Sequence, residues 1–153
     1  MNDKLVDNLR AEYLALQTQY EGFDARVLTI KSWGTLLISG AIAVGFNENS
    51  VAIFLVAIVA SLCLWVLEAI WKSFQYCYTD RIKRIEGWFR EPHTEDIRPF
   101  QIFTAWGEVW DRHFSKPRVL LDILKQPFVF IPYLPVILLS FAGGVWVFFR
   151  AES

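Results

Sequence analysis

Charged side chains are absent from two long parts of this chain, and that distribution limits its fold more than any motif does. Glu48 is the only charged residue between positions 32 and 67, and positions 126–149 contain none. A helix needs about 20 mostly apolar residues to cross the hydrocarbon core of a bilayer, which is about 30 Å thick. The stretches that meet this length are 27–46, 51–71 and 127–149. The sequence therefore predicts an all-α, polytopic membrane protein with three transmembrane helices.

The connections between the predicted spans define their arrangement. Only Asn47–Ser50 separates the first two, so they must form an antiparallel hairpin over residues 27–71. The third stretch contains Pro132 and Pro135, and a proline inside a helix removes a backbone donor and kinks the helix. We expect a proline-kinked spanning helix over 127–149, with a re-entrant or interfacial start as the alternative.

Lysine and arginine are distributed unevenly around these spans. Residues 72–126 contain ten of them, residues 1–26 contain three, and the turn between the first two spans contains none. Loops rich in Lys and Arg stay on the cytoplasmic side of a membrane. We therefore expect the N-terminal arm and the 72–126 segment to be cytoplasmic, and the turn and the C-terminus to lie outside.

The composition argues against several classes of function. A formal net charge of −1 produces no field that would attract nucleic acid. The two cysteines and two histidines form no disulfide framework or metal-binding pattern, and the chain contains no nucleophile motif or phosphate-binding glycine loop. We expect no catalysis, no cofactor, no metal and no nucleic-acid partner.

The N-terminal arm has an apolar stripe with spacings of three and four residues, which is typical of one face of a helix. The stripe consists of Leu5, Leu9, Tyr13, Leu16, Tyr20 and Phe23. We expect residues 1–26 to form an amphipathic cytoplasmic helix that continues into the first span. Either of two elements could pack against this stripe. One is the helix that follows the second span, which has its own stripe from Phe74 to Phe89, and the other is a second subunit or partner protein.

A second amphipathic segment lies at residues 99–114. Its aromatic face consists of Phe100, Phe103, Trp106, Trp110 and Phe114. Because tryptophan is enriched where a membrane meets water, we expect a helix that lies in the plane of the interface. The tryptophans expected to anchor the chain at the interfaces are Trp33, Trp65, Trp71, Trp106 and Trp110.

Lys31 and Glu68 are charged residues near the cytoplasmic ends of the two hairpin spans. Counting outward from the turn places Lys31 opposite Val66. The same count places Glu68 opposite Thr29, so the two charges lie within about one helical turn (~5.4 Å) in depth. We predict an ion pair between them, with Lys72 as a competing partner of Glu68 on its own helix. The pair either fixes the register of the hairpin or lines an ion or proton path, since carboxylates in membranes are costly and often functional.

Small residues four positions apart occur in two of the spans. Ala41 and Gly45 form such a pair in the first span, and Ser140 and Gly144 form one in the third. Pairs of this kind let helix backbones approach closely. We predict that these positions pack helices together, either within the chain or between copies of it.

Three blocks of sequence resemble uncharacterised small bacterial membrane proteins: Thr29–Trp33, Glu68–Tyr76 and Arg81–Glu86. Over residues 5–90, the layout of cytoplasmic helix, tight two-span hairpin and returning helix is similar to the SLATT group. These are two-span effector domains of bacterial conflict and anti-phage systems, for which oligomerisation and breaching of the membrane are expected. This chain differs from that layout by its third span and its aromatic helix.

The resemblance and the polar pair together predict a non-enzymatic protein of the bacterial inner membrane. The expected function is a homo-oligomeric, channel-like or membrane-perturbing effector, with anti-phage defence as the implied role. The alternative is an anchoring or sensing subunit that docks a cytoplasmic protein through the apolar stripe of its N-terminal helix.

Overall fold

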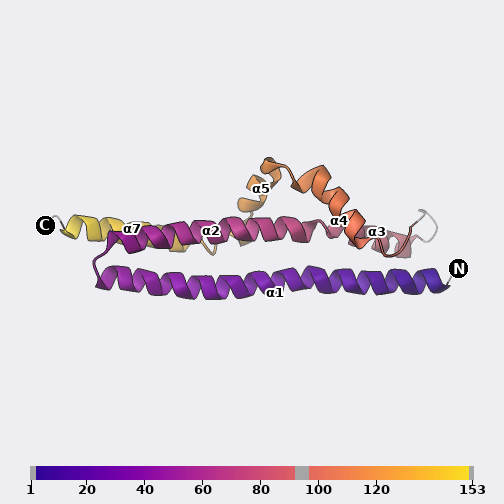
Figure 1. The fold of residues 1–153 in the computed structure, drawn as a ribbon, viewed down its shortest axis with the longest axis horizontal. Coiled ribbons are helices and arrows are strands. Elements are labelled where there is room, and N and C mark those ends of the chain that lie inside the picture. The colour runs from indigo at the N-terminus through magenta and orange to yellow at the C-terminus, as the bar shows by residue number, and fades with distance from the viewer. Residues whose placement is uncertain (1–2, 92–96, 152–153) are drawn as a thin grey trace. The chain divides into compact units, whose positions relative to one another are not determined.

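The computed structural model describes residues 3–91 and 97–151, and these residues fold into helices joined by short turns (Figure 1). The elements in chain order are α1 (Asp3–Asn47), α2 (Val51–Tyr76), α3 (Thr79–Arg90), α4 (Ile102–Val109), the π-helical turn η1 (Trp110–Phe114), α5 (Pro117–Leu124), α6 (Pro127–Phe130) and α7 (Leu134–Ala151). The described residues contain no strand, which confirms the all-α prediction. The helical stretches long and apolar enough to cross a membrane are Asp3–Asn47, Val51–Arg90 and Leu134–Ala151.

α1 is one helix of 45 residues, about 68 Å long at 1.5 Å per residue. The N-terminal arm and the first apolar stretch are therefore continuous, as expected. The helix ends in a tight turn in which Asn49 has a φ of 49°. Asparagine adopts this left-handed conformation more readily than most side chains. The Ser50 N–H donates to the Gly45 carbonyl at 3.1 Å, and α2 then returns antiparallel to α1.

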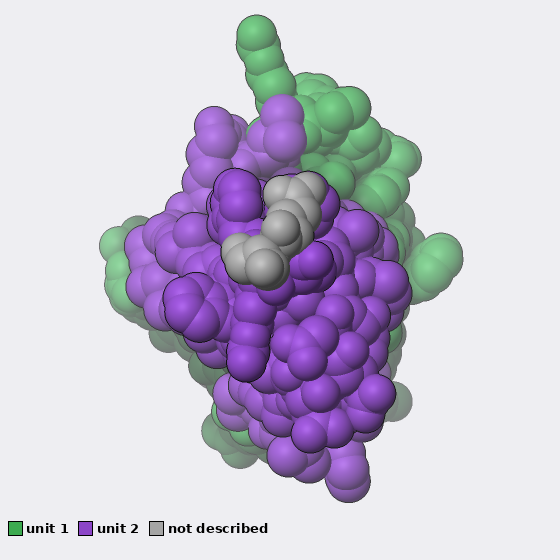
Figure 2. All heavy atoms as spheres, turned by 90° about the vertical axis from the view of Figure 1, so that its left-hand side faces the viewer, with its two compact units in different colours: residues 1–25, 71–120 green, residues 26–70, 121–153 purple. Residues whose placement is uncertain are grey.

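The chain divides into two compact units (Figure 2). Unit 1 comprises residues 1–25 and 71–120, and unit 2 comprises residues 26–70 and 121–153. Unit 2 thus contains the apolar part of the α1–α2 hairpin together with α6 and α7. Its limits on α1 and α2 fall within one residue of the ends predicted for the first two spans.

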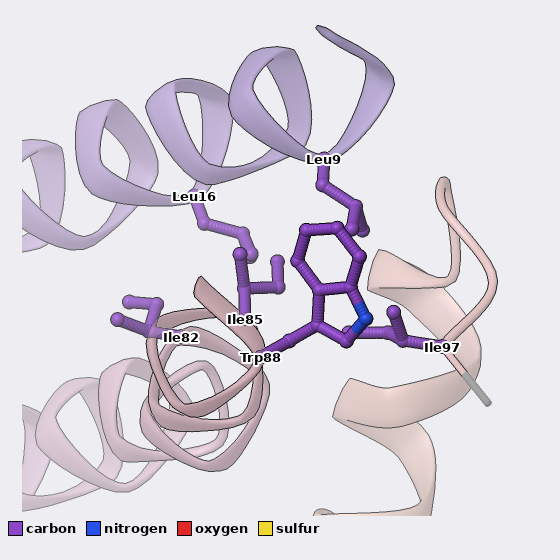
Figure 3. Packing of buried hydrophobic residues seen from close by; sticks show 6 residues of the cluster. All are labelled: Leu9, Leu16, Ile82, Ile85, Trp88 and Ile97. Carbon is purple, nitrogen blue, oxygen red and sulfur yellow. The ribbon is translucent and has the colours of Figure 1, made fainter. Parts of the chain in front are cut away.

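The core of unit 1 forms where α1 packs against α3 (Figure 3). Leu9 and Leu16 extend from α1 and are fully buried. Their neighbours in the cluster are Ile82, Ile85, Trp88 and Ile97. Tyr13 and Tyr20, from the same stripe, pack at its edge. In this structure the stripe packs against the helix that follows α2, which is the first of the two partners expected for it.

The core of unit 2 is organised around Phe54 of α2, which is 1% exposed. A Cβ atom added to Gly143 would lie 2.5 Å from Cε1 of the Phe54 ring, and one added to Gly45 would lie 3.0 Å from Cε2 and Cζ of the same ring. One added to Gly144 would lie 3.3 Å from the Phe54 Cβ. The predicted packing glycines therefore accept an aromatic ring between α1, α2 and α7, rather than bringing two backbones together.

The other two predicted packing positions contribute differently. Ser140 is fully buried, and its hydroxyl donates to the Val136 carbonyl of its own helix at 2.8 Å. Ala41 is only half-buried. Of the two predicted pairs, Gly45, Ser140 and Gly144 are therefore tightly packed or buried, and Ala41 is more open.

The third apolar stretch, expected as a proline-kinked helix over 127–149, is divided in the structure into α6 and α7. α6 ends at Phe130, and α7 begins at Leu134. The break is explained by Pro132 and Pro135, which have no N–H for the carbonyls four residues earlier. α7 alone has 18 residues and is about 27 Å long, close to the thickness of a hydrocarbon core.

Candidate functional site: a buried lysine, glutamate and tyrosine

Three side chains, from α1, from α2 and from the turn between α6 and α7, meet in unit 2. Lys31 Nζ of α1 lies 2.7 Å from Glu68 Oε1 of α2. The Tyr133 hydroxyl, in the turn between α6 and α7, donates to Glu68 Oε2 at 2.9 Å. Oε2 therefore accepts a hydrogen bond, whereas the buried Oε1 faces Lys31 as an ion-pair partner and accepts no hydrogen bond from the described residues. We call Lys31, Glu68 and Tyr133 the polar cluster; it contains the ion pair expected from the hairpin register.

The backbone carbonyl of Phe128, close to the break in the third apolar stretch, also contacts the polar cluster. In a continuous helix the carbonyl of Phe128 would accept from the N–H of residue 132, which is a proline. Lys31 Nζ donates to this carbonyl at 3.0 Å. A lysine side chain thus supplies the hydrogen bond that Pro132 lacks, and it holds α6 at the same point where it neutralises Glu68.

Trp65 likewise donates a hydrogen bond to a backbone carbonyl, at a point just before α6. Its indole N–H donates to the Leu124 carbonyl, at the end of α5, at 3.0 Å. The backbone turns away from helical geometry there because Gln126 is extended and Pro127 follows. Backbone groups in an apolar environment must be satisfied internally. Two hairpin side chains therefore donate to backbone carbonyls of the following segment, Trp65 at the end of α5 and Lys31 near the α6–α7 break.

The burial of the polar cluster determines its electrostatics. The side chain of Glu68 is 2% exposed and that of Lys31 is 18% exposed. Tyr133 is buried as well. Charges this deep are tolerated only when they are paired and hydrogen-bonded, because removing them from water is costly. The formal charges of Lys31 and Glu68 cancel, which suits an apolar environment.

Lys72 does not take the role predicted for it as a competing partner of Glu68. It pairs instead with Asp24 of α1, within unit 1. Its ammonium also donates to Gln75 Oε1 at 2.8 Å, and Gln75 Nε2 donates to Asp24 Oδ2 at 2.9 Å. The physical reason is that both oxygens of Glu68 already have partners in Lys31 and Tyr133, whereas Asp24 offers Lys72 a carboxylate on the facing helix.

The tryptophans predicted as interface anchors differ in their surroundings. Trp33 is exposed on α1. Trp71 packs against Phe23, with ring centroids 5.4 Å apart. Trp106 and Trp110 stack at 5.7 Å with their planes 5° apart.

The aromatic segment is shorter than predicted and partly covered. It begins as a helix at Ile102 rather than at 99, and it ends in the π-helical turn η1. The Trp106 indole donates to the Phe74 carbonyl at 3.0 Å, and the Phe74 ring lies 5.2 Å from that of Trp110. Phe103 remains 87% exposed. Only part of the predicted interfacial face is therefore open.

Unit 1 contains a buried ion pair that the sequence reasoning missed. Arg81 Nε donates to Glu12 Oε1 at 2.8 Å and Arg81 Nη2 donates to Glu12 Oε2 at 3.0 Å. Nη2 also donates to the Arg98 carbonyl at 2.7 Å, and the Phe100 N–H donates to Glu12 at 2.7 Å. The pair therefore holds Arg98 and Phe100, which lie just before α4. The available signal was the position of Glu12, three residues after Leu9 and on the same helical face.

The comparisons with known proteins leave this site without a relative. A scan of protein-family models finds no matching family, and searches of curated proteins and of solved structures find no significant match. Among residues 3–91 and 97–151, no three His, Cys, Asp or Glu side chains are grouped so that they could hold a metal ion. The polar cluster is therefore interpreted from its own geometry.

Proposed function

We propose that the chain is an integral protein of the bacterial inner membrane that crosses it with α1, α2 and α7. Large apolar side chains exposed on these helices support insertion. Examples are Leu36, Leu37, Leu55, Val56, Val59, Leu138, Phe141 and Trp146. Soluble monomers rarely expose apolar surface on this scale, whereas lipid covers it readily. The excess of Lys and Arg outside the hairpin turn supports a cytoplasmic N-terminus and an external C-terminus.

We propose further that the protein acts without catalysis, as a homo-oligomeric channel-like or membrane-perturbing effector in anti-phage defence. The observation that carries this proposal is the burial of the polar cluster among apolar helices. Replacing a buried ion pair by apolar residues is often neutral or stabilising, so stability alone is a weak reason for it. A carboxylate at this depth is more easily explained as part of a path for protons or cations.

The geometry also supports a closed resting state. Glu68 is held by Lys31 and Tyr133, and Lys31 is held by the Phe128 carbonyl at the α6–α7 break. Opening a path past Glu68 requires these contacts to separate. Because Tyr133 lies in a turn rather than inside a helix, movement of α7 is the simplest way to release it.

The burial of the N-terminal stripe disfavours the alternative function, an anchoring subunit that docks a partner through this helix. Leu9 and Leu16 are fully buried against α3. A partner that used these side chains would first have to displace α3 and expose the unit 1 core.

Ion flux from proteoliposomes tests the proposed function. We expect purified protein to release K⁺ or protons from loaded vesicles, and Glu68→Gln to change the rate severalfold because it removes the charge but keeps the shape. Glu48→Gln in the exposed turn is the matched control and should leave the rate unchanged. Vesicles that stay tight with every variant, or equal rates for Glu68→Gln and Glu48→Gln, would contradict the proposal.

A further inference from the structure

A groove between α2 and α7, within unit 2, is separate from the polar cluster and has no part in the proposed flux. Its volume is about 350 Å³, at the lower end of the range for small-molecule sites. One wall consists of α2 residues between Val51 and Ile58, and the other consists of α7 residues between Ser140 and Phe149. We call this site the α2–α7 groove.

The α2–α7 groove opens where small residues alternate with large ones along α7. Ser140 and Gly144 are buried and leave space, whereas the neighbouring Phe141 and Phe148 are large and exposed. The lining side chains are apolar except for Ser140, whose hydroxyl already donates to the Val136 carbonyl of its own helix. Because a polar group that is buried without a partner is costly, a ligand must present a hydrocarbon surface to this groove.

The length and position of the groove match one leaflet of a bilayer. Between Ser140 and Phe149 it follows α7 for about 14 Å, at 1.5 Å per residue. Half of a hydrocarbon core of about 30 Å is about 15 Å. One end of the groove lies at Val51, the first residue of α2, and at Phe149, two residues before the end of α7. In the membrane that these helices are proposed to cross, the groove therefore runs from near the midplane to one surface, as a lipid acyl chain does.

Arg150 supplies a positive charge at the surface end of the groove. It lines a second hollow on α7, and this hollow shares Val145 and Phe149 with the groove, so the two adjoin. A guanidinium group binds phosphate oxygens through charge-assisted hydrogen bonds. Arginine side chains near the ends of spanning helices also extend towards the headgroups. The combination of an apolar groove and an adjoining cation complements an apolar chain that is joined to a phosphate.

We propose that the α2–α7 groove binds one acyl chain of a membrane phospholipid, whose phosphate lies at Arg150. The proposal rests on the membrane insertion proposed above and not on the channel function, because lipid binding is measured without flux. Insertion is measured separately, by whether the protein stays with the membrane pellet after alkaline extraction. A failure of insertion is thereby distinguished from a failure of the lipid site.

Native mass spectrometry of the whole chain, purified in detergent and titrated with lipid, tests the proposal. The probes are phosphatidylglycerol and a diacylglycerol with the same acyl chains, which lacks the phosphate. We expect one phosphatidylglycerol to remain bound per chain. The diacylglycerol should bind about fivefold more weakly, because one basic side chain near an anionic lipid surface contributes about that factor.

Matched variants connect the lipid to the groove. Leu55 lines the groove and is 58% exposed, and Val59, one turn further along α2 and outside the groove, is 59% exposed. We expect Leu55→Trp to weaken binding of both probes severalfold, because the indole fills the groove, and Val59→Trp to leave binding unchanged. Arg150→Gln should weaken binding of phosphatidylglycerol about fivefold and leave that of diacylglycerol unchanged. Arg10→Gln, at an exposed position in unit 1, is its control.

Three results would overturn the proposal. One is the absence of bound phospholipid on a protein that does insert into membranes. The second is an equal loss in Leu55→Trp and Val59→Trp, or in Arg150→Gln and Arg10→Gln, which would show only a general attraction of lipid to the protein. The third is a loss of oligomers in Leu55→Trp with an unchanged lipid count, which would assign the groove to a second copy of the chain.

Discussion

Replacing Glu12 by leucine should destabilise unit 1 more than any other single change considered for this chain. The Arg81 and Glu12 side chains are 4% and 0% exposed, so solvent does not screen the charge that remains on Arg81. Removing one partner of a buried pair costs about 3–5 kcal/mol. The Phe100 N–H also loses its acceptor, which costs about 1–3 kcal/mol. Because these contributions overlap, we expect a loss of about 4–6 kcal/mol in the free energy of unfolding.

A double-mutant cycle separates the charge from the packing. In Glu12→Leu/Arg81→Met no uncompensated charge remains, so we expect the double variant to be more stable than Glu12→Leu by about 3 kcal/mol. Glu12→Gln keeps an oxygen acceptor and should fall between the wild type and Glu12→Leu. The assay is denaturant-induced unfolding in a fixed detergent, followed by far-ultraviolet circular dichroism. A loss below about 1 kcal/mol for Glu12→Leu, or strictly additive effects in the double variant, would refute the reasoning.

Two further predictions concern packing and reactivity. Gly143→Ala should lower the free energy of unfolding by about 1–3 kcal/mol, because its methyl group would lie 2.5 Å from the Phe54 ring. Gly40→Ala, with nothing within 4 Å of the added Cβ, should instead raise it by up to about 1 kcal/mol through helix propensity. Thermal melting checks both, and a shift of the same sign in the two variants would contradict this account of the core. Burial raises the pKa of the Cys77 thiol to about 12, with Asp80 adding to the effect. In a Cys63→Ser background, maleimide labelling should therefore stay slow from pH 7 to 9 until the protein unfolds; rapid labelling of the folded protein would count against this burial.

The parts of the site that follow from local rules could be predicted from the sequence. A turn of a few residues between two stiff helices fixes which positions face one another, so Lys31 and Glu68 could be paired by counting. The apolar spacing of the arm identified the face of α1 that is buried through Leu9 and Leu16. These features depend on helix geometry and not on the rest of the fold.

The other residues of the polar cluster and of the Glu12–Arg81 ion pair depend on contacts that no local rule determines. Tyr133 reaches Glu68 only because the third apolar stretch breaks between Phe130 and Leu134, whereas the two prolines were equally compatible with a kink. Glu12 could have been noticed as a charged residue on an apolar face. Its partner could not, because the position of Arg81 depends on the turn between α2 and α3 and on how α3 then packs against α1.

The oligomeric state of the full-length protein in lipid nanodiscs tests the central claim most directly. The contacts of the polar cluster lie within one chain, and the channel that we propose is formed by several such chains together. Subunit counting by single-molecule photobleaching, at one label per chain, should give a defined number of steps greater than one. A single bleaching step in nanodiscs large enough for several copies would contradict the claim that the protein works as an oligomeric channel.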